Sequence, residues 1–116
     1  MLKKAVVVGA LGVIGRYIVE RLVAEGDWQV IGLSRRPEKN GPRYHHISVD
    51  LLDLDDVAAK LEGLRDVTHV FYAAFQAGTG NAAGYASVIE PNRDMLVNSV
   101  TAVARASRKL QRVVLV

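Results

Sequence analysis

The sequence contains no cysteine, few aromatic residues and no long hydrophobic run, and each absence excludes a class of protein. Without cysteine the chain has neither a disulfide framework nor a thiolate nucleophile, which is compatible with a reducing compartment. Aromatic residues make up 6% of the chain and few of them are interleaved with its basic residues, so nucleic-acid binding is not expected. The apolar run over residues 5–15 is too short to cross a bilayer and has charged residues where a signal peptidase site would lie.

The composition that remains is that of one ordinary globular domain. The chain has 116 residues, of which 50% are hydrophobic and 23% charged, and its net charge is +3. That length is typical of a single domain, and the sequence has no internal repeat, low-complexity tract or linker. We therefore expect one domain over residues 1–116, cytoplasmic, that binds neither nucleic acid nor membrane.

Short apolar runs alternate with helical patterns along the whole chain. The expected strands cover residues 3–8, 28–33, 44–49, 67–74 and 112–116. The expected helices follow the first strand as far as Gly26, begin again after Asp53, and cover residues 86–109, with loops at 37–42 and 75–84. This alternation predicts an α/β fold with a doubly wound parallel sheet, strand order 3-2-1-4-5, in three αβα layers, with a ligand between strands 1 and 4.

Apolar spacing supports the first and the last helix. Ile14, Ile18 and Leu22 recur every four residues in the first, which predicts a buried stripe. In the last, Pro91 either starts the regular helix or kinks it. The stripe predicted for this last helix consists of Ile89, Leu96, Val100, Val103 and Leu110.

Three glycines at the end of the first strand carry the strongest functional signal. They form a G-x-x-G-x-x-G pattern in which Gly9 allows a sharp turn, Gly12 lets the backbone approach a pyrophosphate, and Gly15 lets the helix pack against the sheet. The N–H groups of the first helical turn would face the phosphates. The alternative is a tight turn without a ligand. The candidate binding residues are Gly9, Leu11, Gly12, Val13, Ile14 and Gly15.

A basic pair follows the second strand, where NAD-specific sites carry an acidic residue for the ribose hydroxyls. This chain has Ser34, Arg35 and Arg36 there. Two guanidiniums and a hydroxyl suit a 2′-phosphate, which predicts NADP(H) as the cofactor. The alternative is a solvated basic loop, since Lys39 and Arg43 are close in sequence.

Weaker signals follow the third and fourth strands. Asp50 can accept a hydrogen bond from the adenine amino group and Leu51 can cover the ring, although Asp50 is equally suited to a turn. Small residues after the fourth strand leave room for the nicotinamide ribose, or they reflect ordinary sheet packing. The candidates there are Ala73, Ala74 and Phe75, and Asn92 on the last helix joins them, although a solvated helix face explains it equally well.

The histidines and serines do not suggest a metal site or a hydrolase. His45 and His46 are neighbours on a strand, so they point to opposite faces and cannot chelate one ion. His69 lies within the fourth strand and is expected to be packed rather than catalytic. No serine stands in a G-x-S-x-G motif. No metal ligands are therefore expected.

Taken together, these residues resemble the short-chain dehydrogenase/reductase superfamily with its Rossmann fold, of the extended or closely related atypical type. Three runs resemble the progesterone 5-beta-reductase and iridoid synthase group in particular: GLSRRP at 32–37, DVTHVFYA at 66–73 and NRDMLVN at 92–98. The resemblance implies NADPH-dependent reduction of activated enone C=C bonds. It covers the whole chain but about the first third of a family member, so we expect an N-terminal portion of a longer protein.

The resemblance carries over cofactor residues and no catalytic ones. The superfamily uses a Tyr with a Lys four residues later, and none of the four tyrosines here has that partner. The expected function is the NADPH-binding portion of a reductase acting on a small carbonyl or enone substrate. A nucleotide-sugar epimerase or dehydratase and a non-enzymatic NADP-sensing module are the alternatives, and a homodimer is left open.

Overall fold

The computed structural model describes residues 2–75 and 82–116, and over 82–88 it describes the backbone alone. Five parallel strands form one sheet in the order β3-β2-β1-β4-β5. Their bounds are β1 Lys3–Val8, β2 Trp28–Ser34, β3 Tyr44–Ser48, β4 His69–Tyr72 and β5 Arg112–Leu115. The predicted strand order is therefore confirmed. β4 is shorter than the predicted 67–74 at both ends, and its carboxyl end coincides with that of β1, whose Val8 lies opposite Tyr72.

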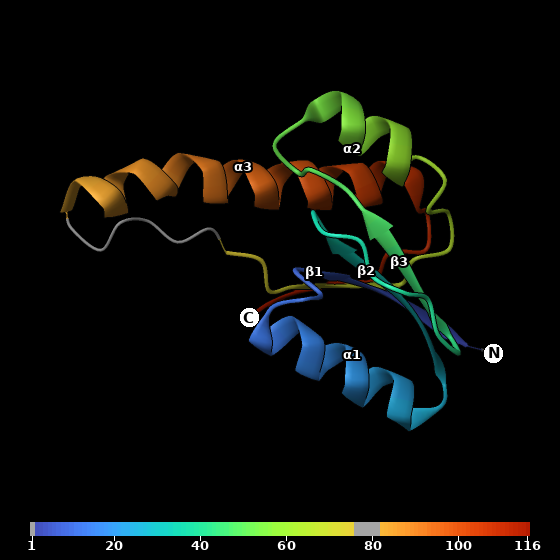
Figure 1. Cartoon of the computed structure of the whole chain (residues 1–116). Helices are drawn as coiled ribbons and strands as arrows, with labels where there is room; N and C mark the ends of the chain where they lie inside the picture. The colour runs from blue at the N-terminus through green and yellow to red at the C-terminus, as the bar shows by residue number, and fades with distance from the viewer. Residues whose placement is uncertain (1, 76–81) are drawn as a thin grey trace.

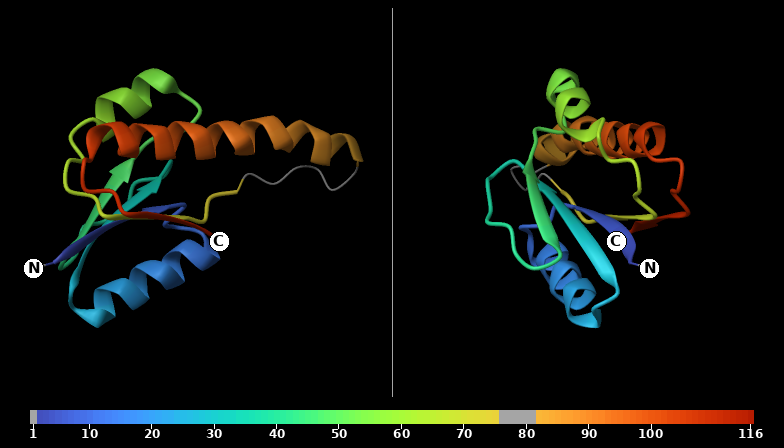
Figure 2. Two further views of the ribbon diagram at one scale, coloured as in Figure 1. Left: turned by 180° about the vertical axis from the view of Figure 1, so that it is seen from behind. Right: turned by 90° about the vertical axis from the view of Figure 1, so that its right-hand side faces the viewer.

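Helices cover both faces of this sheet and make three layers. α1 (Val13–Glu25) lies on one face, while α2 (Leu54–Leu61) and α3 (Ala82–Ala106) lie on the other (Figures 1 and 2). The doubly wound αβα architecture is thus confirmed. None of these helices, as far as the chain is described, has the length and apolar character needed to cross a membrane.

Alternate residues of the central strands build two cores. Val6 and Val8 of β1 join the cluster beneath α2 and α3, and Ala5 and Val7 join the cluster beneath α1. All four are fully buried, as expected for a strand covered by helices on both sides. The sheet is therefore fixed from both faces, and its carboxyl edge can present loops in defined positions.

α3 differs from its prediction in extent and in its buried face. It begins at Ala82 and ends at Ala106, so residues 82–84 of the predicted loop are helical; residues 76–81 lie outside the described part. Pro91 lies inside the helix and does not start it. Val103 is buried as predicted, but the Ile89 side chain is 69% exposed. The reason is visible in Figures 1 and 2, where the amino-terminal part of α3 extends beyond the sheet.

Candidate functional site

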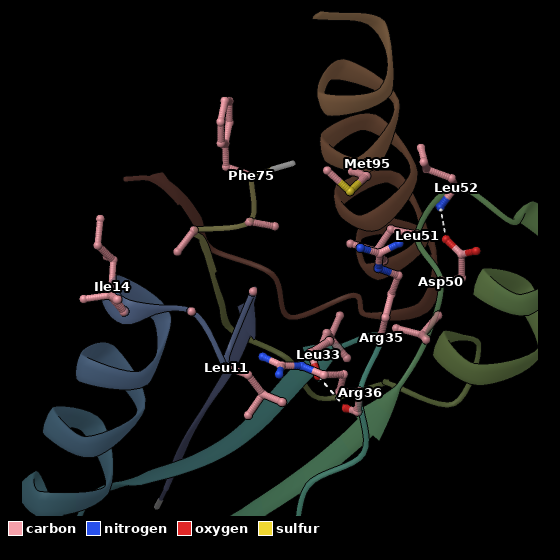
Figure 3. A pocket seen from close by; sticks show the side chains of 17 residues that line it. Leu11, Ile14, Leu33, Arg35, Arg36, Asp50, Leu51, Leu52, Phe75 and Met95 are labelled. Carbon is pink, nitrogen blue, oxygen red and sulfur yellow. Dashed lines mark hydrogen bonds between the residues drawn. The ribbon is translucent and has the colours of Figure 1, made fainter. Parts of the chain in front are cut away.

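A cavity of about 700 Å³ opens at the carboxyl edge of the sheet, where β1 and β4 lie side by side. Its volume is within the range of small-molecule and cofactor sites. Four segments that follow β1 to β4 line it, together with one side chain from α3: Gly9, 11–14, 33–36, 49–52, 73–75 and Met95 (Figure 3). The switch-point location expected from the topology therefore contains a cavity.

Gly9 turns the chain out of β1 in a conformation that suits glycine. Its φ is +83°, and a Cβ there would lie 2.7 Å from the backbone nitrogen and Cα of Ala74. The Gly9 N–H donates to the Leu33 carbonyl at 2.9 Å. A Cβ on Gly15 would lie 1.9 Å from the Gly9 carbonyl oxygen. Both glycines are therefore needed for the close approach of strand, turn and helix, as the spacing predicted.

Gly12 has a different environment, because the space beside its Cα is open rather than occupied by neighbouring backbone. A Cβ on Gly12 would meet only the Gly9 oxygen, at an ordinary 3.5 Å. Gly12 is also the N-cap of α1, and its helix has no side-chain cap and no acidic residue in the first turn. The first-turn N–H groups and the positive end of the helix dipole consequently lie beside the cavity wall formed by residues 11–14. This arrangement is suited to an anionic group.

Ile14 corrects one sequence expectation. It was expected in the buried stripe of α1, but its side chain is 53% exposed and it lines the cavity. Ile18 and Leu22, the other members of that stripe, pack in the core beneath α1. Ile14 differs because it belongs to the first helical turn, which lies beside the cavity rather than over the sheet (Figure 3).

Arg35 and Arg36 are exposed and line the cavity where β2 ends. Figure 3 shows their side chains diverging, with Arg35 extending toward α3 and Arg36 toward the glycine-rich turn. Within residues 2–75 and 82–116, neither guanidinium makes an ion pair with a carboxylate. Ser34 donates its hydroxyl proton to the Arg36 carbonyl at 2.7 Å. The site therefore presents two cations whose charge is not neutralised by described neighbours.

Asp50 forms a turn, which confirms one of its two predicted roles, and it also lines the cavity, while its contact with adenine stays a prediction. Its Oδ1 accepts from the Leu52 N–H at 3.0 Å, and its own N–H donates to Asp56 Oδ2 at 2.8 Å. That hydrogen bond, followed by the one from Lys60, holds the pKa of the Asp56 carboxyl below its ordinary value. The turn after β3 is thus tied to α2.

Leu51 is held from the opposite side. Its carbonyl accepts a hydrogen bond from Asn98 Nδ2 of α3 at 2.8 Å, and its side chain is buried. A contact between residues so distant in the sequence has no local signal. Asn98 therefore faces the turn after β3, although its polarity alone is equally typical of a solvated helix face.

The end of β4 closes the cavity beside the glycines. Ala73 donates its N–H to the Val8 carbonyl at 2.9 Å, and Phe75 is 71% exposed. Two sequence candidates lie outside the cavity lining: Gly15, which packs beneath it, and Asn92 on α3. The lining also contains residues that the sequence did not single out: Leu33, Val49, Leu52 and Met95. The first three adjoin predicted site residues, whereas Met95 depends on how α3 crosses the sheet.

The histidines are arranged as the strand pattern predicts. His45 is exposed, and His46 next to it is buried. His69 packs edge-on against Trp28 with ring centroids 4.9 Å apart, and burial, followed by nearby Lys3 and Arg112, lowers its pKa. In the described ranges, no group of three or more potential metal ligands comes together.

Comparison with known proteins agrees with this geometry. Residues 5–116 match the model of the NAD dependent epimerase/dehydratase family. The chain belongs to this family. Its curated relatives confirm the resemblance to the reductase group. A (S)-8-oxocitronellyl enol synthase from Nepeta cataria is 42% identical over a 78-residue alignment that covers 61% of this chain and 20% of that protein. A 3-oxo-Delta(4,5)-steroid 5-beta-reductase from Arabidopsis thaliana is 32% identical over a 118-position alignment that covers 96% of this chain and 29% of that protein.

Proteins of known structure share the fold. Yeast methylglyoxal/isovaleraldehyde reductase complexed with NADPH superposes with a TM-score of 0.80 at 23% identity, over 97% of this chain and 36% of that one. A short chain dehydrogenase from Burkholderia cenocepacia J2315 in complex with NADP gives 0.78 at 21% identity, over 90% and 48%. The chain therefore spans less than half of these structures and, at 20% and 29%, under a third of the two curated relatives.

Proposed function

We propose that this chain is the NADP(H)-binding portion of a cytoplasmic oxidoreductase that reduces a small carbonyl or enone substrate by hydride transfer. The observation that carries the proposal is the cavity itself. It joins the uncapped start of α1 to two guanidiniums that have no described carboxylate partner. A dinucleotide with a 2′-phosphate is anionic at both of these points.

The residues present fit such a cofactor. The pyrophosphate is assigned to the first-turn N–H groups of α1, with Gly12 leaving the space for its approach. The 2′-phosphate is assigned to Ser34, Arg35 and Arg36, which occupy the position where an NAD-specific site has a carboxylate. A planar guanidinium can bind a phosphate through two parallel hydrogen bonds, so two arginines at this position favour a ligand with a 2′-phosphate.

The remaining contacts orient the two ends of the cofactor. The turn after β3 uses Asp50 Oδ1, so Asp50 Oδ2 is assigned to the adenine amino group, with Leu51 against the ring. Ala73 and Ala74 leave space for the nicotinamide-side ribose at the end of β4. When bound, the nicotinamide supplies the hydride, and the protein's part in this chain is to bind and orient it.

The matched charge variants Arg35→Ala, Arg36→Ala and Lys39→Ala test this proposal. Lys39 is an exposed cation three residues further along the same loop and does not line the cavity. Each arginine variant should weaken NADPH binding by about 1–3 kcal/mol, a roughly 5- to 150-fold rise in Kd, and leave NADH binding nearly unchanged. Calorimetric titration measures both constants. Equal losses for NADPH and NADH, or an equal loss in Lys39→Ala, would contradict the 2′-phosphate assignment.

A further inference from the structure

The segment that carries the two arginines is held from behind by β3. Residues 44, 46 and 48 alternate along this strand and therefore share one face. Ser48 donates its hydroxyl proton to the Arg35 carbonyl at 2.6 Å. His46 places Nε2 2.9 Å from the Arg36 carbonyl. Two successive carbonyls of the arginine segment, residues 34–36, are thus fixed by side chains from the neighbouring strand.

The partners of His46 determine where its proton lies. A carbonyl oxygen can only accept, so His46 Nε2 carries the hydrogen and donates it to Arg36. The same N–H lies 2.9 Å from Ser34 Oγ, which in turn donates to the same carbonyl. In the neutral ring His46 Nδ1 then accepts, and its neighbour at 2.9 Å is the Tyr44 hydroxyl. Every polar atom of the ring therefore has a defined role.

Tyr44 anchors this chain of hydrogen bonds beneath the glycine-rich turn. A Cβ on Gly32 would lie 2.1 Å from the Tyr44 hydroxyl oxygen and 2.8 Å from the Ala10 Cβ, so the hydroxyl occupies the space that glycine leaves in β2. Burial, reinforced by Glu38 and opposed by Arg16, raises the pKa of Tyr44. The hydroxyl therefore stays protonated and donates a hydrogen bond to His46 Nδ1.

We propose that His46, supported by Ser48, is a positioning residue that sets the preference for NADPH over NADH by holding Arg35 and Arg36 toward the 2′-phosphate. This inference rests on the proposed cofactor. His46 is 9% exposed and does not line the cavity, so it acts through the Arg36 carbonyl rather than on the ligand. A loop fixed before binding loses less conformational freedom when the ligand arrives.

Three variants of the adjacent histidines test the inference by calorimetric titration with NADPH and NADH. His46→Leu removes the donor to Arg36 and should raise the NADPH Kd about tenfold while changing the NADH Kd less than about threefold. His46→Gln places an amide N–H near the original Nε2 position and should keep most of the preference. His45→Leu, the same change on the exposed opposite face, should leave both constants unchanged.

Ser48→Ala keeps the experiment decisive even where His46→Leu fails to fold. This variant removes the Ser48 hydroxyl that donates to the Arg35 carbonyl and should also lower the preference for NADPH. Ser48 is partly exposed, so its loss disturbs the core less than a change at buried His46. Equal weakening of NADPH and NADH would show a purely structural role and overturn the inference. If the unaltered chain prefers NADPH and Arg36→Ala loses that preference while His46→Leu and Ser48→Ala keep it, this inference fails and the cofactor assignment stands. If the unaltered chain shows no preference, the cofactor assignment itself fails.

Discussion

At the scale of single residues, the three glycines of the turn after β1 have three different physical reasons. Gly9 needs its positive φ and its closeness to Ala74, Gly15 needs contact with the Gly9 carbonyl, and Gly12 needs open space. The spacing of these glycines predicts all three reasons, because a strand that turns directly into a helix restricts each position differently. Two of the three glycines therefore meet a packing requirement, and the third leaves open space beside the cavity.

Gly15→Ala tests the packing requirement. Its Cβ would overlap the Gly9 carbonyl, so the helix must shift, and we expect a loss of about 1–3 kcal/mol in the free energy of unfolding. Urea denaturation followed by circular dichroism measures it. Gly63→Ala is the matched control, because nothing lies within 4 Å of its added Cβ, and it should change stability by less than about 1 kcal/mol. Stability equal to that of the unaltered chain in Gly15→Ala would contradict the packing role.

The sequence identifies the candidate binding residues, but it does not identify the residues that hold them in place by hydrogen bonds. Arg35 and Arg36 follow an apolar strand directly, which local patterning reveals. His46 was considered only as a metal ligand, and its contact with the Arg36 carbonyl depends on the register that pairs Ser34 with Ser48. Because that register is set by the packing of both sheet faces, no local pattern encodes it.

At the scale of secondary-structure elements, α2 shows how a short helix positions the site. The Asp53 side chain caps it by accepting from the N–H groups of Asp55 and Asp56. Asp56 in turn accepts from the Asp50 N–H, so the helix start holds the turn that lines the cavity. The predicted stripe of α3 was wrong at Ile89, since amphipathic spacing does not reveal where a helix outruns its sheet.

Asp53→Ala should therefore reduce the free energy of unfolding by about 1 kcal/mol, the usual value of an N-cap. The loss arises because the N–H groups of Asp55 and Asp56 would lose their acceptor. The same denaturation measurement applies. Asp66→Ala, which removes an exposed ion pair with Lys109, should cost less than about 1 kcal/mol. A cap variant no less stable than this control would show that α2 does not depend on its cap.

At the scale of the whole molecule, alternating strands and helices predicted the sheet order and the position of the cavity. Right-handed crossovers leave few topologies for five parallel strands, and the predicted order 3-2-1-4-5 is one of them. The outer wall of the cavity did not follow, because Met95 lines it from α3 and Asn98 of the same helix holds the Leu51 carbonyl, both through long-range packing. The sequence thus predicts which strands meet at the cavity, but it does not predict which side chains of α3 complete the cavity wall.

The central claim is that this cavity binds a dinucleotide through a 2′-phosphate, and calorimetric titration of the unaltered chain with NADPH and NADH tests it most directly. The two ligands differ only in that phosphate, so the difference in free energy isolates its contacts with the arginine segment. We expect NADPH to bind at least about tenfold more tightly, as charge-assisted contacts to a phosphate imply. Equal affinities, or no binding of either nucleotide at millimolar concentration, would contradict the account.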